Sequence, residues 1–368
     1  MERSLHILLC APYGGIAGGI SRWTGHIMKY YRSLQPADVN LSVLTTARSV
    51  FMNIDSSAWS RIRYGIKDYS GIFREYRRQL REGHYDVVHL TSSASWGLVK
   101  DIYMLRKARA AKLRTVIHFR FGRIPELFEK KNWEWRLLMK TVQLADRVVV
   151  IDKASFETLR SAGFGHIVNL PNPISPAVDV FVETHSRPDS KANRIVLFAG
   201  HMVRTKGIYE LIEACKEIPG IRLKMIGTLL PGIKQELLGR ASKNGDVSWI
   251  EIAGERPYEE VLEEMLKCTV FVLPTYTEGF PNVVLESMAC GCPIVATSVG
   301  AIPEMLDGGA GIVIEPRNVE QLRDAVAWVL ENPERAAEMG AQAARRVYER
   351  YSMPAVWLQL TDLWKNIP

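Results

Sequence analysis

The sequence lacks several features that would assign it to a particular class of protein. No apolar run approaches the ~20 residues that cross a bilayer, and the first apolar run, HILLCA (6–11), is too short for a secretory signal. Cysteine is scarce, five in 368 residues, and no pair has the partners of a zinc site. We therefore expect neither a membrane-spanning nor a disulfide-stapled protein, but a cytosolic one with buried free thiols.

Three ligand-binding motifs are also absent. The chain contains no Asp-x-Asp, so it has no carboxylate pair at that spacing for Mg²⁺ or Mn²⁺ on a diphosphate. The glycine-rich stretch YGGIAGG (13–19) does not match the dinucleotide fingerprint G-x-G-x-x-G, and it lacks the Lys-Ser/Thr of a P-loop. These absences disfavour a nicotinamide oxidoreductase, and we expect no metal cofactor.

Charge is distributed unevenly along an otherwise ordinary globular composition of 47% hydrophobic and 24% charged residues. Residues 1–140 contain 24 Lys and Arg against 11 Asp and Glu, a net charge of +13, whereas the remainder carries −6. This asymmetry indicates that the first half meets something anionic: a membrane surface, a phosphate-bearing substrate or nucleic acid. A solvated surface of helical Lys and Arg is the alternative.

Short β-branched runs alternate with amphipathic stretches, which predicts an α/β protein with doubly wound parallel sheets. The polar, proline-containing stretch 182–193 interrupts the alternation and is typical of a linker. We expect one Rossmann-like domain over 1–181, a second over 194–350 and a terminal helix over 351–368. The predicted strands of the first domain are 6–11, 41–46, 86–90, 115–119, 147–151 and 166–170, and its predicted helices include 98–113 and 126–145.

Two glutamates eight residues apart are conspicuous in TYTEGFPNVVLE (275–286). The preceding apolar run VFVLP predicts a buried strand, and NVVLESMAC predicts a helix that begins near Pro281 and Asn282. Glu278 would then lie at the carboxyl end of the strand, and Glu286 about two helical turns further on. Ligands of open α/β sheets bind at this edge, toward which the turn would direct its backbone amides.

Charged and glycine-rich loops follow other predicted strands. Arg204 and Lys206 in AGHMVRTKG could neutralise a diphosphate leaving group, although two cations in one loop are equally consistent with surface charge. His118 ends the strand TVIHF, where a neutral imidazole could accept a hydrogen bond from a substrate hydroxyl; a lone histidine is more often a packed residue. Gly18 and Gly19 precede a helix whose N-terminus favours anions.

Together these stretches resemble the retaining nucleotide-sugar glycosyltransferases of the GT-B fold, the family numbered four (glycosyl transferases group 1). The most specific marker is the E-x7-E motif, matched by Glu278 and Glu286 and followed by SMACGCPIVAT. ADRVVVIDKASFETL, LPNPI, AGHMVRTKG and GAIPEML are each similar to a family block. The resemblance covers nearly the whole chain. It implies two Rossmann-like domains whose parallel sheets face across a cleft, with the C-terminal helix crossing back to the first domain.

The resemblance also implies roles for the matching residues. Glu286 is expected to hydrogen-bond the ribose hydroxyls of the nucleotide, Glu278 to touch the donor sugar and Lys206 to bind the diphosphate. His118 is expected near the donor sugar, with the N-terminal glycine loop beside the diphosphate. The loop and helix-start positions expected at the donor phosphates are Gly18, Gly19, Phe280, Pro281, Asn282 and Val283.

One position departs from the family pattern. The block G-R-L-x-x-x-K-G usually carries arginine where this sequence has His201. Histidine is mostly neutral near pH 7 and cannot form the bidentate hydrogen bond of a guanidinium group. We hypothesise that Arg204, in the same loop, supplies the missing charge, so both His201 and Arg204 are candidates for binding the diphosphate.

The resemblance further implies transfer with retention of anomeric configuration, in which the leaving diphosphate takes the acceptor's proton. Glu278 then positions the sugar and is not a nucleophile. UDP-sugars are the favoured donors, with GDP-mannose next. Lys206, Arg204 and the helix-start amides are expected to replace a metal ion, so the reaction needs no cofactor beyond its nucleotide-sugar co-substrate.

The stretch 59–81 is the only indication of the acceptor. It places aromatics among seven Lys and Arg, which fits a patch resting on anionic lipid head groups. Similar enzymes often extend lipid-linked saccharides. We therefore expect a lipid-linked glycan acceptor in cell-surface polysaccharide synthesis, and a cytoplasmic protein in peripheral contact with the inner face of the cell membrane.

Other interpretations of the same sequence stay open. A soluble enzyme with a small acceptor would have the same donor-binding residues, and the basic stretch could be a solvated helix face. A noncatalytic nucleotide-sugar-binding protein is a further alternative. A nucleic-acid-binding or scaffold protein would explain the basic half but not the paired glutamates, so we expect no nucleic-acid partner.

Overall fold

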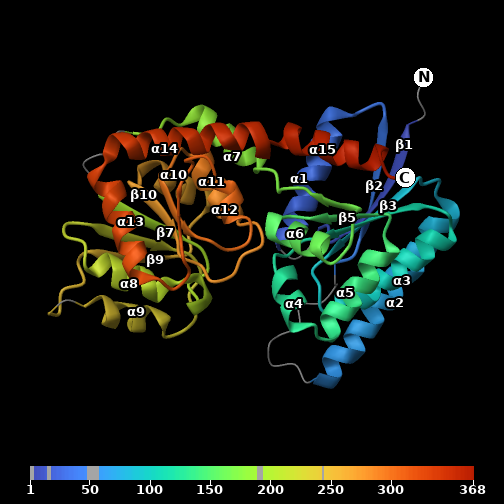
Figure 1. Cartoon of the computed structure of the whole chain (residues 1–368), viewed down its shortest axis with the longest axis horizontal. Helices are drawn as coiled ribbons and strands as arrows, with labels where there is room; N and C mark the ends of the chain where they lie inside the picture. The colour runs from blue at the N-terminus through green and yellow to red at the C-terminus, as the bar shows by residue number, and fades with distance from the viewer. Residues whose placement is uncertain (1–3, 15–17, 48–57, 189–193, 243) are drawn as a thin grey trace. The chain divides into compact units, whose positions relative to one another are not determined.

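A computed structural model describes residues 4–14, 18–47, 58–188, 194–242 and 244–368, with the backbone alone over 58–68. The chain divides into two compact units, each built on its own sheet (Figure 1). The first unit comprises residues 1–171 and 356–368, and the second comprises residues 172–355.

The β-branched runs of the first half form one parallel sheet of six strands in the order β2-β1-β3-β4-β5-β6. The α/β class predicted from the alternating pattern is therefore confirmed. The strands are β1 (Leu5–Ala11), β2 (Val39–Thr45), β3 (Val87–Ser92), β4 (Arg114–Phe119), β5 (Arg147–Val150) and β6 (Ile167–Asn169). The helices that connect them are α1 (Gly19–Leu34), α2 (Ala58–Glu82), α3 (Gly97–Ala110), α4 (Ile124–Lys130), α5 (Trp133–Leu144) and α6 (Lys153–Ser161).

Both faces of the first sheet are covered. Because side chains alternate along a strand, Leu8 and Cys10 of β1 join a core with residues of α3 and α5. The neighbouring strand residues face the other way, where His89 of β3 contacts Trp23 of α1. Residues 356–368, which include most of α15 (Met353–Lys365), pack in this unit, and Trp364 of that helix is fully buried beside His89.

The helix predicted over 126–145 is two helices. Lys131 has a left-handed backbone (φ 46°) that ends α4, and the Asn132 side chain then accepts the Trp135 amide hydrogen at 3.1 Å as the N-cap of α5. Asparagine is a favoured N-cap, so the Lys131-Asn132 pair stops one helix and starts the next.

The second unit repeats the architecture with the strand order β12-β11-β10-β7-β8-β9, all parallel. Its strands are β7 (Ile195–Ala199), β8 (Arg222–Ile226), β9 (Ile250–Gly254), β10 (Val270–Leu273), β11 (Ile294–Thr297) and β12 (Ile312–Ile314). Its helices are α7 (Pro176–Thr184), the 3₁₀ turn η1 (Arg204–Lys206), α8 (Ile208–Lys216), α9 (Ile233–Ala241), α10 (Tyr258–Lys267), α11 (Asn282–Ala289), α12 (Ile302–Met305), α13 (Val319–Glu331), α14 (Pro333–Arg346) and the π turn η2 (Val347–Tyr351).

The boundary between the units differs from the predicted one. The division falls between Pro171 and Asn172, before the expected linker at 182–193. The reason is that α7 packs on the second unit against α10 and α11, and the Ile174 amide donates to the Tyr351 carbonyl at 2.7 Å. At the C-terminal end the division falls after Ala355, inside α15, and not at residue 350.

The structure also bears on membrane insertion. Over the ranges that it describes, the longest helices are too polar or too short to be candidates for a bilayer span. The basic helix α2 contains the predicted membrane-facing patch, but the side chains of its first half lie outside the described residues. In its second half Arg78 pairs with Glu75 at 2.7 Å, and Tyr76 is fully buried with its hydroxyl donating to the Met104 carbonyl.

Candidate active site

The strand order of the second sheet places two of the predicted loops next to each other. Neighbouring strands β7 and β10 are parallel, but the chain leaves β7 toward β8 and leaves β10 toward β11 on the opposite side. Their carboxyl ends therefore form a topological switch point, where open α/β sheets bind ligands. Lys206 follows β7 and Glu278 follows β10, so the predicted cation and carboxylate belong to one site.

Lys206 and Glu278 form an ion pair across the switch point, with the Lys206 ammonium donating to Glu278 Oε1. Their side chains are 23% and 16% exposed, so the pair is shielded but reachable from solvent. The backbone ties the loops together as well, because the Tyr276 amide donates to the Thr205 carbonyl at 2.8 Å. The loop that carries the cation and the loop that carries the carboxylate are thus held in a fixed relation.

Glycine allows this close approach. Gly207 ends η1 with φ +68°, and a Cβ built there would lie 1.9 Å from the Pro274 carbonyl oxygen at the end of β10. Gly300 has φ +56°, and its Cβ would lie 2.5 Å from the Glu278 carbonyl oxygen. Any larger residue at either position would push apart the backbone that carries Lys206 or Glu278.

Helix α11 begins beside Glu278 and carries Glu286. Pro281 precedes its first residue, and none of the described side chains caps it, so its first amides are available to an anion. Glu286 is only 9% exposed, and its Oε1 accepts the Tyr258 hydroxyl hydrogen at 2.9 Å. Asn282, the first residue of α11, contacts Asn172, whose side-chain amide donates to Asn282 Oδ1 at 3.3 Å. The predicted geometry of strand, turn and helix start is therefore present.

The remaining predicted residues of this unit line its surface or core. Arg204 and His201 are exposed, with the Arg204 guanidinium 5.7 Å from the ring of Tyr209. Phe280 is buried against Tyr351, and its carbonyl faces the Asn172 side chain, so it anchors the turn. Val283 lies in the first turn of α11 and is half-buried.

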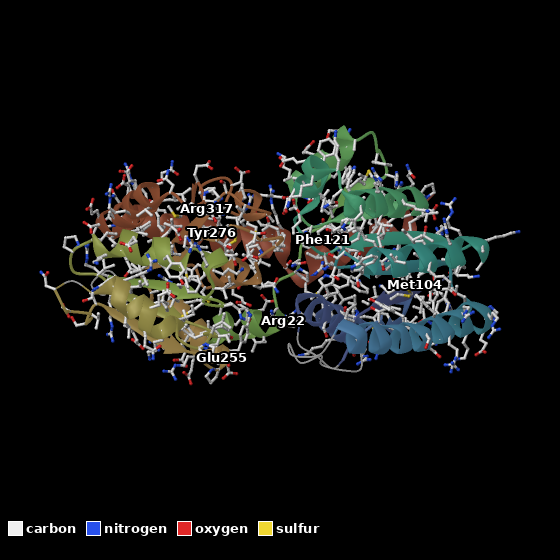
Figure 2. All side chains as sticks on the ribbon, turned by 90° about the horizontal axis from the view of Figure 1, so that it is seen from below. Arg22, Met104, Phe121, Glu255, Tyr276 and Arg317 are labelled. Atoms are coloured by element: carbon white, nitrogen blue, oxygen red, sulfur yellow. The ribbon has the colours of Figure 1, made fainter. Side chains whose placement is uncertain are left out.

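Sequence reasoning missed several polar residues near this site. Tyr258, the partner of Glu286, starts α10 and carries no motif that would have marked it. Tyr276 donates to Glu210 of α8, and the Arg317 guanidinium lies 4.6 Å from its ring (Figure 2). Tyr276 precedes Glu278 by two residues, so its place in the E-x7-E stretch could have marked it as a site residue. Arg317 follows β12, and no sequence motif marked it.

In the first unit His118 belongs to a buried chain of rings. The indole of Trp364 donates to His89 Nδ1 at 2.9 Å, and His89 Nε2 lies 3.3 Å from His118 Nδ1. Burial lowers the pKa of His89 to about 3, and burial lowers the pKa of His118 well below its ordinary value. Both rings are therefore neutral, and Trp364 forces the His89 proton onto Nε2. A neutral His118 can then accept either from His89 at Nδ1 or from Arg120 at Nε2, but not from both.

The role expected for His118 depends on which of these two hydrogen bonds is made. The sequence suggested a hydrogen-bond acceptor for a substrate hydroxyl; His118 Nε2 lies 3.2 Å from Arg120 Nη1, which can only donate, so an Nε2 that accepts already has Arg120 as its donor. The Trp23 indole N–H and Arg120 Nε are buried and donate to none of the described residues. Donors therefore converge here, and an oxygen acceptor on a ligand would satisfy them.

The glycine loop is only partly described. Gly18 is the N-cap residue of α1 with φ −158°, an extended backbone that any residue adopts, and its carbonyl accepts from the Arg22 amide at 2.9 Å. Among the described residues, none comes within 4 Å of a Cβ built at Gly18 or Gly19, their chain neighbours apart. Within the described ranges, no side chain therefore covers these two positions at the start of α1. The preceding residues 15–17 lie outside the described ranges.

The buried histidines make the stability of the first unit pH-dependent. Because the folded-state pKa of His89 is depressed from 6.5 to about 3, the unfolded chain binds its proton first as the pH falls. We expect the free energy of unfolding to fall by about 2 kcal/mol for this group between pH 6.5 and 5. Denaturant titrations of the wild type, His89→Gln and the exposed control His84→Gln at both pH values measure it. If the free energy of unfolding of His89→Gln fell between pH 6.5 and 5 by as much as that of the wild type, the assignment to His89 would be contradicted.

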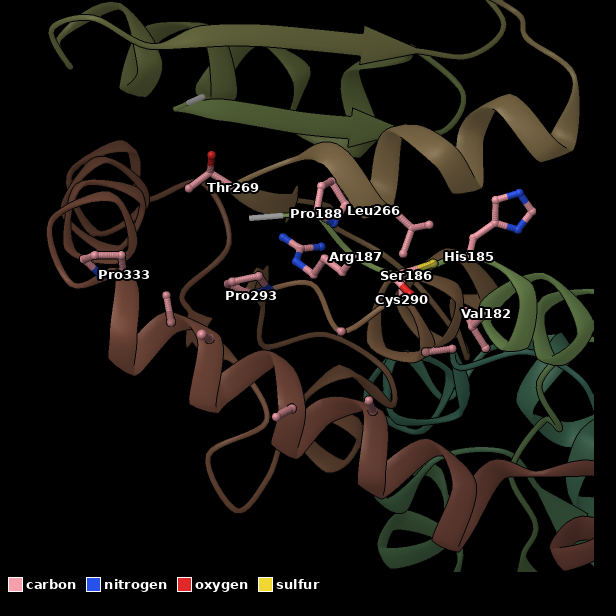
Figure 3. Close-up of a pocket in the computed structure, with 16 residues that line it drawn as sticks. Val182, His185, Ser186, Arg187, Pro188, Leu266, Thr269, Cys290, Pro293 and Pro333 are labelled. Carbon is pink, nitrogen blue, oxygen red and sulfur yellow. The ribbon is translucent and has the colours of Figure 1, made fainter. Parts of the chain in front are cut away.

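A pocket of about 670 Å³ lies at the opposite edge of the second sheet (Figure 3). Its lining includes Thr269 and Pro293, which precede β10 and β11, so it opens at the amino ends of these strands and not at the switch point. Arg187 reaches into it and donates to the Met265 carbonyl at 2.9 Å and to Cys292 Sγ at 3.5 Å. The five cysteines are free and buried, as expected.

Two family models match the two halves of the chain. Residues 17–178 match "Glycosyltransferase Family 4", and residues 183–346 match "Glycosyl transferases group 1". The chain belongs to these glycosyltransferases, and its two six-stranded sheets are those of the GT-B fold. Members of this class are transferases, and the class is as far as the matches identify the protein.

Individual relatives and structures agree with the family. D-inositol 3-phosphate glycosyltransferase of Paenarthrobacter aurescens is 29% identical, covering 73% of this chain and 70% of its own. An uncharacterized glycosyltransferase of Methanocaldococcus jannaschii is 34% identical, but the match spans 39% of this chain and 40% of that protein. HepE of Anabaena in complex with UDP has a TM-score of 0.73 at 17% identity, with 98% of this chain and 99% of HepE covered. Sucrose-phosphate synthase of Thermosynechococcus elongatus gives 0.71 at 19%, with 98% of each chain covered. These structures share the fold.

Proposed function

We propose that the protein transfers a hexose from a nucleoside diphosphate sugar to a saccharide acceptor with retention of anomeric configuration. The observation that carries this proposal is the Lys206–Glu278 ion pair at the switch point between β7 and β10, beside the uncapped start of α11. An ammonium group and open helix amides favour a diphosphate, and a carboxylate at the same point favours sugar hydroxyls.

Each candidate residue has a proposed part. Lys206 and Arg204 neutralise the diphosphate, with the amides at Asn282 and Val283. Glu286, already hydrogen-bonded to the hydroxyl of Tyr258, accepts from the ribose hydroxyls. Glu278 orients the transferred sugar, and the proposed place of His118 is near that sugar. Gly18 and Gly19 lie beside the diphosphate.

The chemistry needs no protein nucleophile. The bond from the anomeric carbon to the diphosphate breaks, the acceptor oxygen attacks from the same face, and the departing diphosphate oxygen takes the acceptor's proton. The positive charge of Lys206 stabilises the negative charge that develops on the leaving group, and stabilisation of this kind usually contributes most to catalysis at such a site. Glu278 lies within an ion pair, so it serves as a positioning group.

A uridine or guanosine diphosphate sugar is the proposed donor, UDP-sugars first and GDP-mannose next. The complex of HepE with UDP supports the first choice, and the name of a GDP-mannose-dependent mannosyltransferase among the relatives supports the second. We propose a lipid-linked glycan as acceptor and a cytoplasmic protein in peripheral contact with the membrane. The basic first half supports both.

A thermal-shift screen of nucleotide sugars tests the donor. A ligand at 100 times its dissociation constant stabilises the folded protein by ~2.7 kcal/mol, which raises the transition temperature measurably. Transfer or hydrolysis of the best donor then distinguishes an enzyme from a noncatalytic binding protein. Stabilisation by no nucleotide sugar would contradict the proposal. Transfer to water-soluble acceptors without binding to anionic vesicles would favour a soluble enzyme with a small acceptor.

Metal independence is a separate prediction. The sequence has no Asp-x-Asp, and among the described residues no group of three His, Cys, Asp or Glu side chains has the arrangement of a metal site. We expect turnover to persist in excess EDTA because Lys206, Arg204 and the α11 amides meet the diphosphate. Complete loss of turnover that Mg²⁺ restores would contradict this.

A further inference from the structure

Two buried thiols of the second unit lie in contact where neighbouring strands begin. Cys268 precedes β10 and Cys292 precedes β11, and these two strands are paired in parallel, with Phe271 beside Ile294. Adjacent strands lie about 4.8 Å apart, so residues that enter them side by side satisfy the Cα separation of a disulfide, roughly 4.4–6.8 Å. The two Sγ atoms are 3.9 Å apart. The sulfurs therefore face each other at a separation that small movements of the two side chains close.

A guanidinium group lies against this pair. Arg187 donates to Cys292 Sγ at 3.5 Å, and its hydrogen bonds to the Met265 carbonyl, at 2.9 Å, and to the Cys268 carbonyl fix it in place. While protonated, the Cys292 thiol donates to the same Met265 carbonyl at 3.0 Å. Once ionised, the sulfur keeps Arg187 as a donor, and a positive charge beside sulfur stabilises the thiolate, which is the nucleophilic form.

The two thiols differ in acidity. Burial raises the pKa of both, but at Cys292 the hydrogen bond from Cys268 and the charge of Arg187 outweigh burial and lower the pKa. Burial and the contact with Cys292 hold the pKa of Cys268 well above its ordinary value. The Cys215 thiol in α8 shows the effect of burial alone, a raised pKa. Cys292 is therefore the thiol that ionises first, with the protonated Cys268 beside it.

The pocket of about 670 Å³ gives access to the pair (Figure 3). Cys268 and Cys292 have no exposed surface themselves. The pocket lining, however, includes Pro293 next to Cys292 and Thr269 next to Cys268. Arg187, which contacts the Cys292 sulfur, also reaches into the pocket. A small uncharged oxidant therefore has an approach to the thiols from this side.

We propose that Cys292 and Cys268 form a thiol site that hydrogen peroxide, or another small hydroperoxide, oxidises to a disulfide. The Cys292 thiolate attacks a peroxide oxygen: the S–O bond forms, the O–O bond breaks, and the departing hydroxide takes up the proton that Cys292 released. Cys268 Sγ then attacks the sulfenic acid: the S–S bond forms, the S–O bond breaks, and the hydroxyl leaves as water with the Cys268 proton. The two thiols lose two electrons, which reduce one peroxide to two molecules of water.

The disulfide lies at one end of the two helices that carry the contact between Glu286 and Tyr258. Tyr258 begins α10, and Cys268 caps the other end of that helix. Glu286 lies in α11, whose Ser287 carbonyl accepts from the Cys292 amide at 3.0 Å. Closing the sulfurs from 3.9 Å to about 2.05 Å draws these helix ends together. Given the proposed function, on which this step rests, we expect the movement to disturb Glu286 and to weaken donor binding about threefold.

Peptide mapping of the full chain by mass spectrometry tests the site. The reduced protein is treated with hydrogen peroxide, the remaining thiols are alkylated, and linked peptides are identified. We expect a Cys268–Cys292 bond in the wild type that dithiothreitol reverses, and no such bond in Cys268→Ser or Cys292→Ala. Cys215→Ser is the matched control, because Cys215 is equally buried, and it should form the bond as the wild type does. The wild-type map decides the pairing even if a variant fails to fold.

The part of Arg187 is measured by the rate of oxidation. Arg187→Gln should react about tenfold more slowly near pH 7, the effect of raising the thiol pKa by one unit, and its rate should rise at higher pH than that of the wild type. Arg187→Lys keeps the charge and should lose less. Arg222→Gln is the control, since Arg222 is 64% exposed and pairs with Glu251 on the surface. Identical pH profiles of Arg187→Gln and wild type overturn the activation by Arg187.

The outcomes separate this inference from the proposed function. Absence of a disulfide after peroxide treatment, or a disulfide that uses Cys290, overturns the thiol pair. A Cys268–Cys292 bond supports the pair whether or not the reduced protein binds a nucleotide sugar. If the reduced protein binds UDP-glucose or GDP-mannose, equal affinity of the reduced and oxidised forms overturns the link to α11, and weaker binding by the oxidised form supports it.

Discussion

Replacing Lys206 by alanine is expected to lower kcat/KM for sugar transfer by about 10²–10³-fold, the loss seen when one charge-stabilising group at a developing anion is removed. Lys206 lies at the switch point and is paired with Glu278. The next residue, Gly207, lets its loop pack closely against Pro274 at the end of β10. Because the leaving diphosphate gains charge as the sugar bond breaks, the effect should appear in kcat more than in donor affinity. Steady-state kinetics with the best donor from the thermal-shift screen measure it.

Lys216→Ala is the matched control for this substitution. Lys216 ends α8, the helix that follows Lys206, and its ammonium donates to the Arg240 carbonyl at 3.0 Å on the exposed surface. It should keep wild-type kinetics. Since Lys206 and Glu278 interact directly, Glu278→Ala on top of Lys206→Ala should cost less than the sum of the single changes. Full activity in a folded Lys206→Ala protein would remove the proposed charge stabilisation.

The second cation of the loop can be assigned by the same kinetics. Arg204 and His201 are both exposed, and the Arg204 guanidinium lies over Tyr209, so it must turn toward a diphosphate for the proposed role. We expect Arg204→Ala to weaken turnover more than His201→Ala, because arginine is always charged and can bind two oxygens at once. Intact turnover in Arg204→Ala with turnover abolished in His201→Ala would assign the role to the histidine.

Local patterns predicted the elements of the site well. The β-branched run before TYTEGFPNVVLE became β10, and the proline and asparagine after the turn started α11 as expected, because strand, turn and helix-start signals lie within a few residues of each other. The helix predicted over 126–145 and the linker predicted over 182–193 were wrong in part, because local patterns carry no information about tertiary contacts. Lys131 and Asn132 break a stretch whose apolar period continues, and α7 leaves the linker because of its contacts with α10 and α11.

Contacts between residues that lie far apart in the chain could not be predicted from the sequence pattern. Lys206 and Glu278 are 72 residues apart, and only the neighbouring positions of β7 and β10 in the sheet bring them together. His89 meets Trp364 over a separation of 275 residues, and that contact fixes the proton of a neutral His89 on Nε2.

Glu286→Ala is expected to weaken donor binding about a hundredfold. A carboxylate that accepts from both ribose hydroxyls makes two charge-assisted hydrogen bonds, each of about 1.5–3 kcal/mol, part of which water replaces in the variant. Glu286 is already oriented for this purpose, since burial at 9% exposure and the Tyr258 hydroxyl leave its carboxylate little freedom. Isothermal titration with the nucleoside diphosphate and with the complete nucleotide sugar should show the same loss for both ligands.

Two further variants make the assignment specific. Glu286→Gln keeps the size and one acceptor oxygen, so its loss should be intermediate, and Tyr258→Phe should cost only a few fold because it frees an orienting contact and leaves the carboxylate in place. Glu263→Ala, on the exposed face of α10 where Glu263 pairs with Lys267, controls for the loss of one negative charge and should bind as wild type. The 2′-deoxyribose form of the nucleotide removes a hydroxyl group from the ligand, as Glu286→Ala removes the carboxylate from the protein. If Glu286 binds the ribose hydroxyls, wild type should bind the deoxy ligand more weakly than the ribose ligand, whereas Glu286→Ala should bind the two ligands with equal affinity. An equal loss of affinity for the deoxy ligand in both proteins would place the ribose away from Glu286.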